Sequence, residues 1–150
     1  MSVEQNIIDA FKSLLPLCNE ETGYNYDWSS CTVTEDADDP ARIKDSEYPF
    51  IDIGFTDEIS ESQDRNTSHM ANILTCNIAV IPVHKNATRE NIDNVLTDIK
   101  KFVNNNHTLN GSCFYAWYDR SRRFTNQIYG KHYGILITLK IRYFQDKINP

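Results

Sequence analysis

The chain has 150 residues, of which 40% are hydrophobic, and it carries a formal net charge of −6. This composition is typical of one globular domain spanning residues 1–150 and excludes a disordered chain. The acidic balance argues against a general nucleic-acid binder, which neutralises phosphates with lysine and arginine. No apolar run is long enough to cross a bilayer and the first residues lack the basic segment of a signal peptide, so we expect a soluble, cytoplasmic product.

The N-terminal segment predicts an amphipathic helix. Apolar residues recur at helical spacing after Ser2, a favourable N-cap, and the pattern ends at Pro16. Residues 19–45 are polar and rich in turn formers, and within them residues 31–34 have the composition of a short edge strand. The apolar stripe of the helix, expected to pack on a sheet, is formed by Val3, Ile7, Ile8, Phe11, Leu14 and Leu15.

Two strands joined by a polar segment follow. Residues 48–55 alternate in polarity, with Pro49 at the start of the strand. Residues 70–83 form a longer alternating run, which predicts the central strand of the sheet; at about 3.3 Å per residue it must bend or project beyond its own domain. Residues 56–68, which connect the two runs, are polar, and the flanking strands can continue into them as a protruding β-hairpin arm. One face of the long strand should carry Leu74, Cys76, Ile78 and Val80.

The C-terminal half predicts another helix and a strand pair. Thr88 can cap a helix that ends at the asparagine run 104–106. An aromatic-rich strand is expected at residues 113–119, and residues 133–144 alternate over a full strand. The apolar stripe of this helix is formed by Ile92, Val95, Leu96, Ile99, Phe102 and Val103.

These elements predict an α+β fold in the order helix, strand, strand, helix, strand, strand. The sheet should be mainly antiparallel. Both helices are positioned to cover the same face of the sheet, and the order leaves room for the β-hairpin arm.

Recognisable catalytic, cofactor or metal-binding motifs are missing from the sequence. The four histidines lie far apart, and neither a glycine-rich phosphate loop nor a nucleophile elbow is present. The acidic residues between 35 and 39 lack the spacing and the glycine of a calcium loop. We therefore expect no catalytic residue, no cofactor and no metal. The four cysteines, which are widely separated and expected to act as small buried hydrophobic residues, are Cys18, Cys31, Cys76 and Cys113.

Two interpretations that involve nucleic acid stay open. Asp52 lies on a predicted strand, where a restriction-type nuclease has its first acidic ligand, but the next candidate strand has Thr138 where the second carboxylate should precede Lys140. Separately, arginines follow the aromatic run 114–118, an arrangement that can stack bases and hold phosphates. The alternative is that alternate aromatic residues pack in the core while the arginines lie at a solvated strand end or meet an acidic neighbour.

The chain thus combines a first helix, a strand that opens with Tyr48-Pro49-Phe50-Ile51-Asp52-Ile53, a polar arm, a long strand at 72–83, a helix at 92–103 and a closing strand pair. Over nearly its whole length this combination resembles the tail terminator proteins of long-tailed bacteriophages. The resemblance implies a non-enzymatic structural protein that forms a ring, usually hexameric, on the end of the completed tail tube. Such a ring stops polymerisation of tube protein and provides the surface to which the head attaches.

The same resemblance implies the partners and the location. The partners would be further copies of the chain, the tail tube protein and a head completion or connector protein, without a membrane. The protein would lie in the virion at the head–tail junction, after assembly in the host cytoplasm, and its acidic charge suits a lumen through which DNA passes without specific binding. A head completion or head–tail adaptor protein is the nearest alternative, and a metal-dependent nucleic-acid-processing enzyme is a more distant one.

A closed ring needs a head-to-tail interface between identical subunits. Exposed strand edges and a polar arm supply donors and acceptors for such an interface. The candidate contacts with neighbouring subunits or the tube are Asp57, Glu58, Glu61, Asp64, Arg65, Arg120, Arg122 and Arg123.

Overall fold

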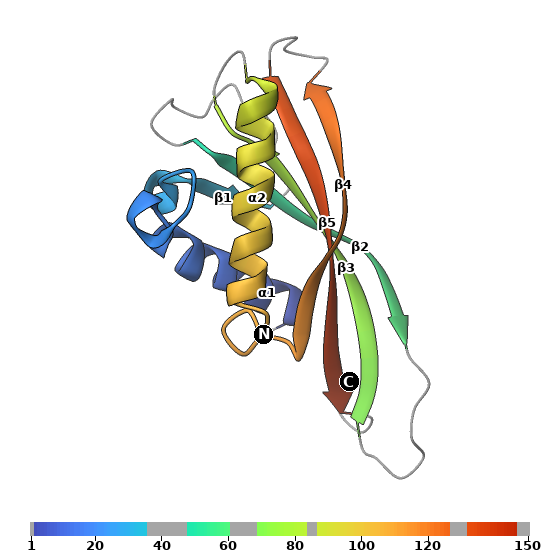
Figure 1. The fold of residues 1–150 in the computed structure, drawn as a ribbon. Coiled ribbons are helices and arrows are strands. Elements are labelled where there is room, and N and C mark those ends of the chain that lie inside the picture. Colours follow the sequence, from blue (N-terminus) through green and yellow to red (C-terminus); the bar gives the residue numbers. More distant parts are fainter. Residues whose placement is uncertain (1, 36–47, 61–68, 84–86, 127–131, 147–150) are drawn as a thin grey trace.

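The computed structural model describes residues 2–35, 48–60, 69–83, 87–126 and 132–146. One layer of sheet lies against one layer of helices (Figure 1). In chain order the elements are α1 (Val3–Leu14), the 3-10 turns η1 (Leu15–Leu17), η2 (Glu20–Thr22) and η3 (Trp28–Ser30), the strands β1 (Thr32–Thr34), β2 (Phe50–Ser60) and β3 (His69–Ile81), the helix α2 (Arg89–Asn105), and the strands β4 (Tyr115–Asn126) and β5 (His132–Asp146).

The sheet has five strands in the order β1-β2-β3-β5-β4. β1 pairs with β2 in parallel, and the other pairs are antiparallel. The predicted α+β class, the mainly antiparallel sheet and the central position of β3 are confirmed. β1 is the short edge strand expected at 31–34, so the observed order contains one strand more than the predicted helix, strand, strand, helix, strand, strand.

Both helices begin where their capping residues predict. The Ser2 side chain accepts a hydrogen bond from the backbone N–H of Gln5 at 3.1 Å. At α2, the Thr88 hydroxyl accepts from the Asn91 N–H at 3.1 Å, and the Asn91 side-chain oxygen accepts from the Thr88 N–H at 2.9 Å. This reciprocal pair satisfies two donors that a helix start otherwise leaves without partners.

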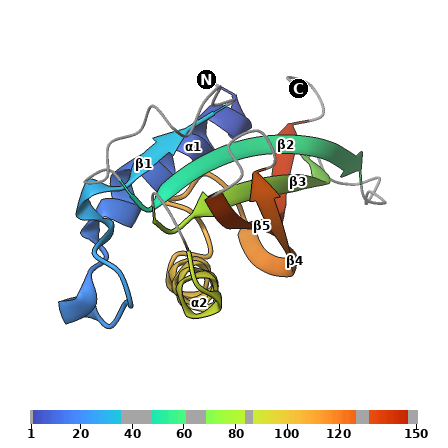
Figure 2. The same ribbon diagram turned by 90° about the horizontal axis from the view of Figure 1, so that it is seen from above.

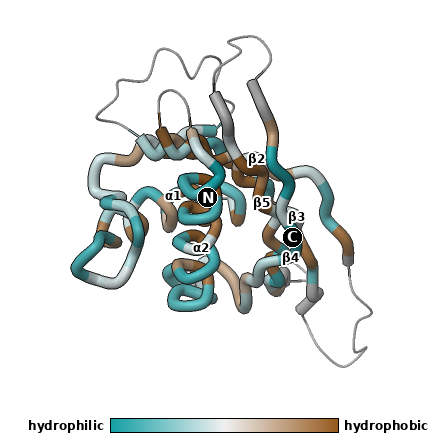
Figure 3. The backbone as a smooth tube through the Cα atoms, turned by 45° about the horizontal axis from the view of Figure 1, so that its top comes forward, coloured by the Kyte–Doolittle hydropathy of each residue, from teal (hydrophilic) through white to brown (hydrophobic). Residues whose placement is uncertain are grey.

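The two helices cover the same face of the sheet, as predicted (Figure 2). Their apolar stripes meet through Phe11 and Phe102, whose ring centroids lie 5.1 Å apart. Hydrophobic residues line the strands behind them (Figure 3). Burying each such side chain fully contributes about 1.5–3 kcal/mol. From the two central strands the core receives Leu74, Cys76, Ile78, Val80, Ile135, Ile137, Leu139 and Ile141.

A buried carboxylate joins α2 to the segment that follows α1. Asp98, only 1% exposed, accepts hydrogen bonds from the backbone N–H groups of Asn25 at 2.8 Å and Tyr26 at 3.0 Å. It also accepts from the indole nitrogen of Trp28 at 2.9 Å. This role was not predicted, although an aspartate between Val95 and Ile99 interrupts the apolar stripe and is the signal that the sequence offered.

The last strand pair differs from the prediction. β4 extends through Asn126 instead of ending near residue 119, so the arginines lie inside the strand and not at its solvated end. β2 and β3, the strands that flank residues 61–68, do continue as an arm, but β5 also forms part of this arm. Beyond Ser60, the last β2 residue paired with β3, the arm is a ribbon of β3 and β5 that extends past the helices to the pair His69 and Asp146 (Figure 1).

Candidate interaction surface

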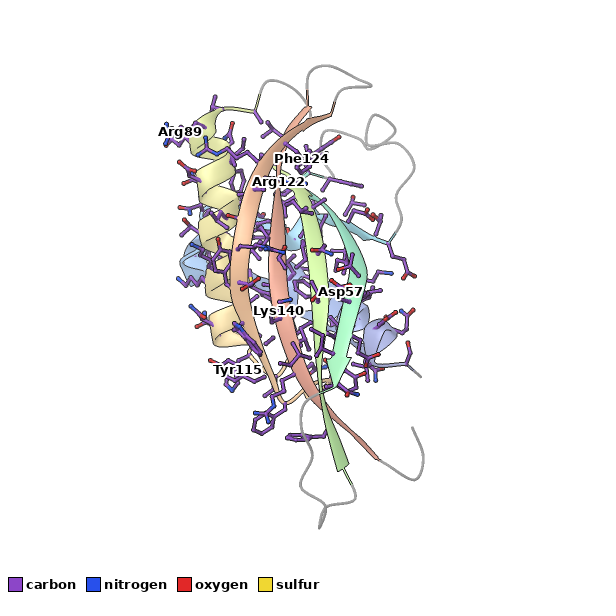
Figure 4. All side chains as sticks on the ribbon, turned by 90° about the vertical axis from the view of Figure 1, so that its right-hand side faces the viewer. Asp57, Arg89, Tyr115, Arg122, Phe124 and Lys140 are labelled. Carbon is purple, nitrogen blue, oxygen red and sulfur yellow. The ribbon has the colours of Figure 1, made fainter. Side chains whose placement is uncertain are left out.

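The sheet face turned away from the helices is not covered by any element in the described part of the chain (Figure 4). We call it the open face. Its side chains come from positions that alternate with the core positions, and one row across it runs from Arg122 through Leu136 and Ala79 to Asp52. Strand periodicity therefore divides the sheet into an apolar face for folding and a mixed face available for binding.

Hydrogen bonds between side chains fix the middle of the open face. The Thr138 hydroxyl donates to the Asn77 side-chain oxygen at 3.2 Å, and the Asn77 amide donates to the Thr56 hydroxyl at 3.0 Å. The Lys140 ammonium donates to the Thr75 hydroxyl at 2.7 Å. Because these bonds link β2, β3 and β5, the surface is ordered before any partner arrives, which lowers the entropic cost of binding.

A hollow of about 550 Å³ lies on this face beside β4. Its lining combines two arginines with hydroxyl and amide groups from the neighbouring strands. Arg120 contacts Asp119 at 3.8 Å, but its side chain is 76% exposed, so this ion pair contributes little and leaves the guanidinium accessible. The arrangement suits an anionic group such as a carboxylate. The lining residues are Asn77, Arg120, Ser121, Arg122, Leu136 and Thr138.

The structure separates the residues predicted to make contacts. Arg120 and Arg122 face the hollow together, whereas Arg123 donates to Asp93 of α2 at 2.9 Å, on the helix side. Two more of the set, Asp57 and Glu58, are exposed on β2, toward the opposite edge of the sheet from β4. Figure 4 shows Asp57 there. The three remaining residues, which lie outside the described ranges, are Glu61, Asp64 and Arg65.

The lower part of the sheet exposes large apolar side chains. Phe114 is 54% exposed and Phe144 is 48% exposed, and their ring centroids lie 5.1 Å apart. The Arg142 guanidinium lies 5.8 Å and 5.5 Å from the two rings. On β2, Ile59 is 60% exposed, in the row that runs through Ile73 to Arg142. Grouped apolar side chains of this size are typical of an interaction surface. These residues were not among the predicted contacts, although Phe144 falls on the polar side of its strand.

The residues considered for a nuclease do not form a site. Asp52 accepts a hydrogen bond from the Thr34 hydroxyl at 3.1 Å at the β1–β2 pair. Lys140 faces Thr75, four residues along β3 from Ala79, the partner of Asp52, which corresponds to about 13 Å. Among the described residues, no three histidine, cysteine or acidic side chains are grouped so that they could hold a metal ion.

The cysteines are free thiols. Cys18 and Cys76 are buried as predicted, whereas Cys31 and Cys113 are only partly buried. Burial raises the pKa of Cys31 to about 12 and that of Cys113 to about 11, and it raises the pKa of Cys76 as well. These thiols therefore stay protonated near neutral pH, where they are poor nucleophiles.

No protein-family model matches the sequence, and no curated protein matches it closely enough to indicate relatedness. Across the described ranges, none of the helices combines the length and the apolar character needed to span a bilayer.

Proposed function

We propose that this chain is a structural, non-enzymatic component of a bacteriophage tail, a terminator that forms a ring on the end of the tail tube. One observation carries the proposal. A single sheet has one face closed by helices and an opposite face that is ordered yet open, and its strands project past the helices. A protein whose task is assembly needs such surfaces more than it needs a catalytic pocket.

The exposed groups fit contacts with other proteins. Aromatic side chains near the base of the arm can bury apolar area against a partner, and arginine is enriched in protein interfaces. In this proposal the neighbouring copies complete the ring, the tube protein lies below it, and a head completion or connector protein lies above it. The protein would thus reside at the head–tail junction of the virion, with DNA passing through the lumen.

Two alternatives predict different partners. A head completion or adaptor protein would use the same kind of surface but act on the head side of the junction. A nucleic-acid protein is favoured by one feature, the arginine-lined hollow with Lys140 and Trp117 opposite each other in the next row. The net charge of −6 opposes this second alternative.

Electron microscopy of tails assembled with and without the protein tests the proposal. We expect overlong, headless tubes without it and tails of uniform length when the purified protein is added back. A matched control is the same addition with a denatured sample, which should not restore tail length.

Two other results would contradict termination. Normal, capped tails together with heads that leak DNA would assign the protein to the head side. Unchanged tails and heads, combined with binding of single-stranded nucleic acid that disappears on Arg120→Ala and Arg122→Ala, would favour the nucleic-acid alternative.

A further inference from the structure

The two edges of the sheet are open over long stretches. β1 pairs with β2 only from Phe50 to Asp52, and no other described strand lies along the outer side of β2 at residues 53–60. β4 forms the opposite edge: near its start the Ala116 N–H donates to the His107 carbonyl oxygen at 2.7 Å, and in the described part of the chain no strand pairs with its outer side. Backbone N–H and C=O groups along such edges are ready to pair with another strand.

The two open edges carry opposite charge. Asp57 and Glu58 are exposed on the open stretch of β2. Arg120 and Arg122 are exposed on β4, where Asp119 offsets part of their charge. The β2 edge of one copy therefore attracts the β4 edge of a second copy, whereas two β2 edges or two β4 edges repel each other. Charges arranged in this way favour a head-to-tail contact over a two-fold one.

Strand direction permits the same contact. β2 is antiparallel to β3, β3 to β5, and β5 to β4. Because the strand direction reverses three times from β2 to β4, β4 runs antiparallel to β2. If a second copy continues the sheet in the same orientation, its β4 meets the β2 edge as an antiparallel neighbour, the commoner type of pairing.

Both edge strands also contain an irregularity. The pairing shifts between Phe55 and Glu58 in β2 and between Tyr118 and Arg120 in β4. Bulges bend an edge and hinder pairing with an arbitrary strand. They restrict the partners of these edges to a strand of matching shape.

From these observations we infer that β4 of one copy adds to the open stretch of β2 in the next copy, so that one sheet runs around the ring. The partner is a second copy of this chain, and Arg120 and Arg122 lie near Asp57 of the neighbour, while Glu58, which pairs with Leu74 on the helix side, adds negative charge along the same edge. This inference rests on the proposed ring, but it concerns self-association, which can be measured without tails.

Charge reversal on either edge tests the inference. One variant carries Asp57→Lys and Glu58→Lys, and another carries Arg120→Glu and Arg122→Glu. Sedimentation velocity over a concentration series should show self-association of the wild type, weakened at least about tenfold in each variant. An equimolar mixture of the two variants should associate again, because each then supplies the edge that the other needs. A chain with all four substitutions should also regain self-association.

The matched control is Glu20→Lys with Glu21→Lys on η2, two exposed sites that change the charge by the same amount away from both edges. It should associate like the wild type. A wild type that stays monomeric at its highest soluble concentration would overturn the inference, and so would edge variants that associate normally. Tail capping by the wild type is scored separately and decides the proposed function. If the wild type caps tails and the edge variants self-associate normally, only the edge pairing is rejected.

Discussion

The two faces of the central sheet differ although the same strands build both. On β3, Ile78 is fully buried under the helices, whereas its neighbour Asn77 lies on the open face and bonds to side chains of β2 and β5. The helix side depends on tight apolar packing, which tolerates little change. The open side depends on exchangeable polar contacts. The comparison shows that buried apolar packing and exposed polar contacts come from alternate residues of one strand.

The largest loss of stability should come from Asp98 on the helix side. Asp98→Ala leaves three donors without their acceptor, and we expect the free energy of unfolding to fall by about 3–5 kcal/mol. Urea denaturation followed by tryptophan fluorescence measures this loss. Asp93→Ala, on the same helix, removes an exposed contact with Arg123 and should cost about 0–1 kcal/mol. Equal losses in the two variants would show that Asp98 does not hold the segment that contains Trp28.

A neighbouring pair on β3 tests the two faces directly. Ile78→Ala should cost about 2–5 kcal/mol because it leaves a cavity in the core. Asn77→Ala removes two hydrogen bonds at a partly exposed site and should cost about 1 kcal/mol. Thermal or urea unfolding of both variants measures the two losses in the free energy of unfolding. If Asn77→Ala proved the more damaging change, the open face would be part of the stabilising core.

A smaller effect is expected at Gly134, where β5 passes under Phe124. A Cβ at this position would lie 2.6 Å from the Cζ atom of Phe124 and 2.7 Å from the Val80 carbonyl oxygen. We expect Gly134→Ala to cost about 1–3 kcal/mol. Adding Phe124→Leu should restore only part of this loss, because the carbonyl oxygen remains. The control is Gly54→Ala, since an added Cβ there meets no atom within 4 Å; a comparable loss at Gly54 would exclude steric overlap as the cause.

A separate, pH-dependent effect should appear under alkaline conditions. Burial raises the pKa of Cys31 from 9.0 to about 12 and that of Cys113 from 9.0 to about 11. Above pH 9 the unfolded chain releases these protons while the folded chain retains them, so the free energy of unfolding should decrease as pH rises from about 9 towards 11. Urea titrations at several pH values measure the slope, and Cys31→Ala should reduce it. A slope that Cys31→Ala leaves unchanged would assign the effect to other groups.

The sequence predicted the parts of the fold that depend on local rules. Helix caps at Ser2 and Thr88 and the alternation along β3 follow from short-range chemistry, and these predictions are confirmed. The length of β4 was underestimated, because an edge strand with an open face can carry arginines at positions where a covered strand would need apolar residues. The role of Asp98 depends on residues some 70 positions away, for example Trp28. The aspartate interrupts the apolar stripe of α2, but this local signal does not identify its distant partners.

For the candidate interaction surface, the sequence identified the charged residues but not which of them lie together. It placed three arginines together, whereas strand alternation puts Arg123 on the helix side and Arg120 on the open face. The contribution of β5 to the arm, opposite the start of β3, also depends on sheet register. Register is set by the whole sheet and not by one segment.

Amide hydrogen exchange tests the different roles of the two sheet faces most directly. It is read by mass spectrometry on the free protein and on the protein bound to purified tail tubes. The account predicts that exchange slows at least about tenfold in residues 53–60 and in β4, where strand edges and the open face gain partners, while α1 and α2 stay unchanged. Protection confined to the helices, or no change anywhere on adding tubes, would contradict it.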